Sequence, residues 1–150
     1  MVCVAIASSL TPVYFTTFST LFHLTEEQLG RIAAITFAGF VLGILGTGPL
    51  ADRWGAKRFI LLGTAQVCAG LALLSLAYNY ALLLTAAFVM GIGAGVLDTI
   101  MSPVVSALQP ERRASALNWL HSFYCTGAVA ASLAGSVGLS VGLSWRVMPW

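Results

Sequence analysis

The sequence contains very little charge. Only 8% of its 150 residues are Asp, Glu, Lys or Arg, whereas 59% are hydrophobic. A soluble domain carries about 25% charged residues, so this chain has too little charge to keep a whole surface in water. The net charge of +2 is also too small to indicate a nucleic-acid partner. We therefore expect the lipid bilayer to surround most of the chain.

The sequence also lacks the patterns of common catalytic and cofactor sites. It has no nucleophile elbow, metal-ligand cluster, Walker loop or dinucleotide fingerprint. Its three cysteines, Cys3, Cys68 and Cys125, are odd in number, lie in apolar runs and match no metal-site spacing, so we interpret them as packing residues. The first ten residues, MVCVAIASSL, have no basic region typical of a cleaved signal peptide. We expect neither an enzyme nor a cofactor or metal.

Long apolar runs dominate what is present. A helix that spans a bilayer needs about 20 mostly apolar residues, and these runs do not alternate as barrel strands do. We therefore predict an all-α membrane protein with five transmembrane helices. These cover approximately residues 1–22, 28–50, 59–77, 81–108 and 114–143.

Two joints between these runs carry local signals. Thr25 and Gln28 have the spacing of a capping box that opens the second helix. Pro110 disfavours helical geometry at Gln109 and so ends the fourth helix, and we expect it in the first turn of the fifth.

The few charged residues are unevenly placed, which predicts an orientation. The turns after the second and fourth helices lie on one side of the membrane and hold Arg53, Lys57, Arg58, Arg112 and Arg113. The other side holds only Arg31 and Arg146, with Glu26 and Glu27. Because basic loops stay in the cytoplasm, we predict a cytoplasmic N-terminus and an external Trp150.

The first basic turn, GPLADRWGAKRF, has a distinctive order of residues. We expect Gly48 to let two backbones approach and Gly55 to form a tight reversal. Asp52 suits a helix N-terminus or an arginine partner, and Arg53 can hold a carboxylate through two parallel hydrogen bonds. The turn either latches and releases helical bundles or only fixes the topology.

This string resembles the loop between helices 2 and 3 of the major facilitator superfamily. That loop reads Gly-x-x-x-Asp-Arg/Lys-x-Gly followed by basic residues, and only Ala56 departs from it. The resemblance implies a cytoplasmic gate motif of Gly48, Asp52, Arg53, Gly55, Lys57 and Arg58. It also implies a secondary transporter, in which this chain is five helices of a six-helix N-terminal bundle. The odd number of helices then predicts a fragment, whose partner is a C-terminal six-helix bundle outside this sequence.

Residues 91–127 resemble helices 4 and 5 of the branch that contains fucose and glucose symporters. The shared patterns are Asp98-Thr99, Pro110-Glu111-Arg112-Arg113 and Leu117-Asn118-Trp119-Leu120-His121. Ser102 stands where that branch often has Asn. This second resemblance implies a sugar substrate.

Asp98 is the only acidic residue deep within a predicted span, roughly 15 Å from the end of its helix. A carboxylate in lipid costs several kcal/mol, so such residues face cavities or carry protons, although a structural acid is the alternative. Gly91 and Gly95, on the same face, form a close-packing pattern.

Other polar residues mark possible cavity faces. Asn118 and His121 share a stripe of the fifth helix with Ser122 and Cys125. Asn118 could bind a sugar hydroxyl and His121 could relay a proton, or His121 is an interfacial residue. Ser8, Thr11, Pro12 and Ser19 lie on one side of the first helix and either line a cavity or pack.

Together these features predict a proton-coupled, alternating-access transporter for a small polar solute, a sugar being one candidate. Two alternatives stay open. One is a drug or metabolite exporter of the same superfamily, and the other is a truncated membrane scaffold that transports nothing.

Overall fold

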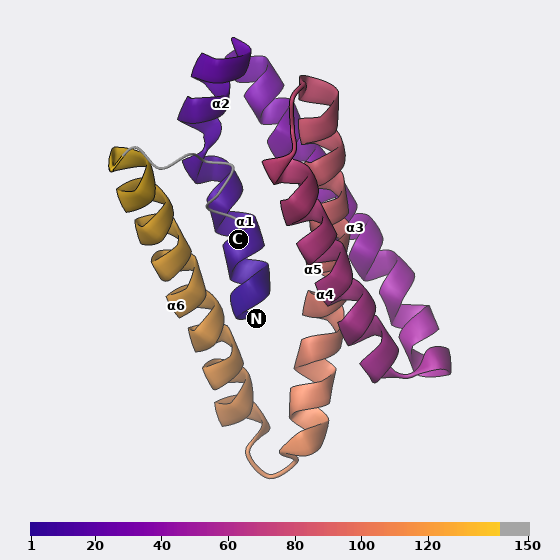
Figure 1. Cartoon of the computed structure of the whole chain (residues 1–150). Coiled ribbons are helices and arrows are strands. Elements are labelled where there is room, and N and C mark those ends of the chain that lie inside the picture. The colour runs from indigo at the N-terminus through magenta and orange to yellow at the C-terminus, as the bar shows by residue number, and fades with distance from the viewer. Residues whose placement is uncertain (142–150) are drawn as a thin grey trace.

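The structure, a computed structural model, describes residues 1–141 and consists of α-helices without strands in that range (Figure 1). The predicted positions of Arg146 and Trp150 lie outside the described residues. The helices are α1 (Val2–Val13), α2 (Phe15–Phe22), α3 (Glu26–Trp54), α4 (Ala56–Ser75), α5 (Tyr80–Leu108) and α6 (Arg113–Ser140). This architecture confirms the prediction of an all-α protein.

Four helices, α3 to α6, are long and apolar enough to cross a membrane. They coincide with the second to fifth predicted spans. The first predicted span is instead divided into α1 and α2 at Tyr14, whose backbone (φ −88°, ψ −1°) leaves the helical path. Pro12 lies just before this break and removes one backbone donor from the helix. The division falls two residues after Pro12.

The local signals at the helix ends are mostly confirmed. The Thr25 side chain accepts from the Gln28 N–H and the Gln28 side chain accepts from the Thr25 N–H, which completes the capping box. α5 ends before Gln109, as Pro110 predicts. The expected place of Pro110 within the next helix is wrong, because α6 begins only at Arg113. Residues 109–112 instead form a separate turn, in which the Arg112 N–H donates to the Gln109 carbonyl.

Glycines set the close packing of the bundle, in which α3 and α4 both lie against α5. A Cβ atom at Gly39 or Gly43 would lie 2.5 or 2.4 Å from a carbonyl oxygen of α5. Gly91 and Gly95 approach α3 in the same way, which confirms the predicted close-packing role of this pair. α1 packs chiefly on α6, beside this three-helix unit.

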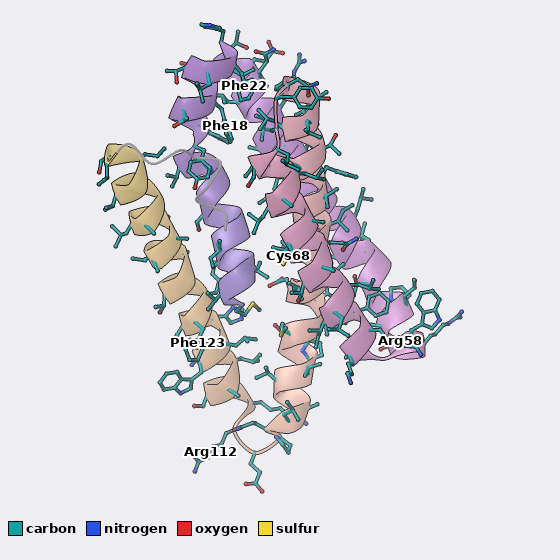
Figure 2. The ribbon with its side chains drawn as sticks, viewed as in Figure 1. Phe18, Phe22, Arg58, Cys68, Arg112 and Phe123 are labelled. Carbon is teal, nitrogen blue, oxygen red and sulfur yellow. The ribbon has the colours of Figure 1, made fainter. Side chains whose placement is uncertain are left out.

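The two basic turns lie at the same end of the molecule, as predicted. Figure 2 shows Arg58 and Arg112 at one end of the bundle, with Phe18 and Phe22 at the opposite end. At that opposite end the Tyr80 hydroxyl donates to the Gln28 carbonyl at 3.1 Å, which joins the start of α5 to that of α3. The two basic turns therefore lie on the same face of the membrane.

Candidate functional site

A pocket of about 350 Å³ lies among α1, α2, α3, α5 and α6. It occupies the middle of the bundle, because its lining residues Phe40 and Ala94 are the central residues of the 29-residue helices α3 and α5. Solute sites of transporters lie near the bilayer midplane, so this position is suited to one. The pocket is lined by Ser8, Pro12, Phe15, Ala33, Thr36, Phe37, Phe40, Met90, Gly91, Ala94 and Tyr124.

Aromatic rings form much of the pocket surface. Phe37 and Phe40 stack on each other with ring centroids 6.3 Å apart and planes 24° apart. Phe15 comes from α2 and Tyr124 from α6, so the rings approach the pocket from three elements. The remaining side chains are small or aliphatic, apart from two hydroxyls. The pocket is therefore largely apolar.

The polar groups of the pocket are uncharged. The Ser8 hydroxyl donates to the Val4 carbonyl and the Thr36 hydroxyl to the Ile32 carbonyl, both at 2.8 Å. Each oxygen keeps lone pairs that can accept from a solute. The structure gives the Tyr124 hydroxyl no partner within residues 1–141, so it can both donate and accept.

Asp98 extends the α5 side of the pocket toward the basic end. It follows Ala94 by four residues and Gly91 by seven, which places it within about 40° of both around the helix. Asp98 does not itself line the pocket, and it is partly buried. Its carboxylate has no hydrogen-bond or ion-pair partner among the described residues. Asp98 is therefore an unpaired acid one helical turn from a midplane pocket, and the choice between a functional and a structural acid stays a prediction.

Asn118 and His121 lie apart from the pocket. Both are exposed in the first three turns of α6, close to the basic end. The Ser122 hydroxyl donates to the Asn118 carbonyl, so this contact stays within the helix. The structure does not bring the three predicted site residues together around one cavity, and their roles stay predictions.

The gate motif forms a helix junction rather than a loop. α3 continues four residues beyond the predicted end at residue 50, so Asp52 and Arg53 lie in its last turn. Only Gly55 separates α3 from α4, and its φ of +83° confirms the expected tight reversal. Charged residues outside the bilayer do not oppose helical geometry, so α3 can continue past the end of its apolar run.

The expected close approach at Gly48 is wrong. A Cβ atom there would meet nothing within 4 Å. Gly48 follows Gly43 by five residues, so it lies about 140° around the helix from the face that packs on α5.

The exposed Asp52 of the gate motif makes no ion pair in the described chain, where Arg31 with Glu27 is the one pair present. Trp54 and Phe59 stack across the junction at 6.3 Å and hold the two helix ends together.

Sequence reasoning missed most of the pocket. The sequence predicts Ser8 and Pro12 as possible cavity residues, but not Thr36, Phe37, Phe40, Met90 or Ala94. A signal was present on α3, where Ala33, Phe37 and Phe40 recur at the i, i+4, i+7 spacing of one helix face. It was hidden because the residues around it are equally apolar.

The helices and their apolar composition define an integral, multi-pass membrane protein. The sequence profile of the Major Facilitator Superfamily matches residues 1–150, and the chain belongs to that family. This membership agrees with the prediction that the chain is not an enzyme.

Individual relatives support the same placement. The chain is 40% identical to the MFS-type transporter criB of Aspergillus cristatus over 61% of its length. It is 30% identical to the 3-(3-hydroxy-phenyl)propionate transporter of Escherichia coli over 86% of its length. It is also 30% identical to the L-fucose-proton symporter of Escherichia coli over 87%.

The chain spans 20%, 32% and 31% of these three relatives, respectively. No solved structure matches it significantly.

Proposed function

We propose that this chain is the N-terminal part of a secondary transporter that moves a small organic solute by alternating access. In such a carrier one helical bundle rocks against another around a midplane site. The observation that supports this most directly is the pocket at the middle of α3 and α5, with Asp98 one turn further along. The second bundle would close the pocket from its open side.

Proton coupling is assigned to Asp98 in this proposal. Asp98 is partly buried and has no partner among the described residues, and carboxylates within membrane spans commonly carry protons. Asn118 and His121 lie nearer the basic end and are assigned to the path between Asp98 and the cytoplasm. The basic end is the cytoplasmic one, since it holds five basic turn residues.

Several solute classes are compatible with the relatives. Their names specify fucose, 3-(3-hydroxy-phenyl)propionate and, for a 38% identical protein of Pseudomonas putida, 4-hydroxybenzoate. All three solutes are small and bear hydroxyl groups, and we propose the same for the solute of this carrier. An exporter of apolar compounds is the second candidate, because the pocket lining is largely apolar.

The Asp98→Asn variant tests the coupling role. It is made in the full-length carrier that contains this chain and reconstituted into proteoliposomes. Asn keeps the size of the side chain but cannot release a proton. Solute exchange, which needs no net proton movement, should persist, whereas accumulation driven by a pH gradient should be lost. Glu26→Gln, which neutralises an exposed acid in the first turn of α3 that makes no ion pair in the described chain, is the matched control and should retain both activities.

Two results would contradict the proposal. Proton-driven accumulation by Asp98→Asn would eliminate Asp98 as the coupling residue. Proportionate loss of exchange, accumulation and protein abundance would identify a structural acid instead, since a structural role predicts loss of folded protein rather than loss of coupling.

A further inference from the structure

The aromatic rings of the pocket point to a narrower class of solute. We infer that the solute carries an aromatic ring with at least one hydroxyl group, and that this ring lies against Phe15, Phe37, Phe40 and Tyr124, here called the ring wall. This inference rests on the proposed transport function and specifies what the pocket holds.

The arrangement of the ring wall is the first argument. Its members come from three elements, so they surround a space rather than form one packed stripe. Phe37 is 66% exposed in this chain, so the core of the bundle does not account for its position. It nevertheless stacks on Phe40 in a parallel pair that lines the pocket. Aromatic rings pair with one another in offset-stacked or edge-on geometry, and each pair adds affinity beyond its buried area.

The polar groups of the pocket supply the second argument. No lining residue is charged, so a carboxylate placed in the pocket would meet no cation from this wall. The Ser8 and Thr36 hydroxyls already donate to backbone carbonyls and can only accept from a solute. A hydroxyl donor on the solute suits these oxygens. A sugar, hydroxylated on nearly every carbon, would leave most of its groups against apolar side chains, which is costly.

The pocket has room for a single ring, and its open side faces the place of the proposed second bundle. Its volume of about 350 Å³ lies near the lower end of the roughly 300–1,000 Å³ range of small-molecule sites. The ring wall and the acceptor oxygens together favour a hydroxylated one-ring compound over a sugar or a large drug.

The test measures binding to the purified full-length carrier by calorimetry. The probes are hydroxybenzyl alcohol, its ring-saturated analogue hydroxymethylcyclohexanol, and glucose. The first two share their hydroxyl groups and differ in aromaticity. We expect the aromatic probe to bind about tenfold more tightly than the saturated one, since two or three ring contacts each contribute a few-fold. Glucose should bind most weakly.

Paired variants locate the contacts. Tyr124→Leu should weaken binding of the aromatic probe about three- to tenfold more than binding of the saturated probe, because both probes lose the Tyr124 hydroxyl but only the aromatic probe loses a ring contact. Phe123→Leu is the control, because Phe123 is the exposed neighbour that projects from the outer side of α6 and does not line the pocket (Figure 2). Thr36→Val should weaken the binding of both the aromatic and the saturated probe. Its control is Thr64→Val, since Thr64 makes the same 2.8 Å bond within α4 outside the pocket.

Each variant is first shown to elute as a single species in detergent. Should Tyr124→Leu fail to fold, Phe37→Leu at an exposed position replaces it. Equal binding of the aromatic and saturated probes, or equal effects of Tyr124→Leu and Phe123→Leu, would overturn the inference. A carrier that accumulates glucose and ignores the aromatic probe would refute the inference and leave proton-driven transport intact. A carrier that binds the aromatic probe and transports nothing would refute the proposed function alone.

Discussion

Gly43 allows α3 to pack directly on α5, and its replacement should measurably weaken the bundle. A Cβ atom at position 43 would lie 2.4 Å from the Ile92 carbonyl oxygen, where ordinary contact begins at 3.4 Å. The obstacle is backbone rather than a flexible side chain, so the helices must separate by about 1 Å. Such overpacking costs about 1–3 kcal/mol.

Gly46 provides a control on the same helix. A Cβ atom there would meet nothing within 4 Å, and Gly46 is exposed. Gly→Ala gains up to about 1 kcal/mol of helix propensity at either position, so this term cancels between the two variants. Gly43→Ala should therefore be about 1–3 kcal/mol less stable than Gly46→Ala.

The difference can be measured by unfolding both variants with increasing SDS in detergent micelles, followed by circular dichroism. Equal midpoints and slopes for the two variants would refute the reasoning, because they would mean that α3 and α5 do not approach as closely as the structure has them.

Three further changes test other parts of the chain. In a cysteine-free background, Tyr78→Cys should react with an impermeant thiol reagent added outside and Arg112→Cys should not; the reverse pattern would invert the orientation. Tyr78 suits this test because it is 75% exposed. Asp52→Asn should impair transport while solute binding survives, since Asp52 lies at the end of α3 far from the pocket; loss of binding at normal abundance would contradict a gate role. Gly55→Ala should destabilise the α3–α4 junction by about 1–3 kcal/mol in the same unfolding assay, because its φ of +83° strains other residues; Gly48→Ala, which meets nothing within 4 Å, should not.

Much of the helical framework could be predicted from the sequence, because the signals are local. A run of about 20 apolar residues must be helical to satisfy its backbone within a bilayer. The capping box at Thr25 depends on residues three apart, and the end of α5 depends on the adjacent Pro110. Two spans separate the two basic turns, so the sequence predicts both turns at the same end of the molecule. The break near Tyr14 was not predicted.

The pocket could not be predicted in the same way, because it depends on which helix faces meet. Apolar residues surround most of α5, so apart from its glycine pair little in its sequence separates the face that packs on α3 from the face that lines the pocket. Isolated polar residues such as Asn118 and His121 attracted attention against this background, yet both are exposed. Phe37 and Phe40 do not stand out from their apolar neighbours in the sequence, yet they line the pocket.

The sequence by itself therefore determined a multi-span helical membrane protein, its basic end and the glycine pair of α5 that permits close packing. Hydrophobic length, charge and capping act along the chain and need no partner. Only the tertiary structure decided that Gly43 rather than Gly48 contacts α5, and that Phe15, Phe37, Phe40 and Tyr124 meet around one space. Those outcomes depend on how the helices rotate and approach one another, which is settled by packing across the whole bundle.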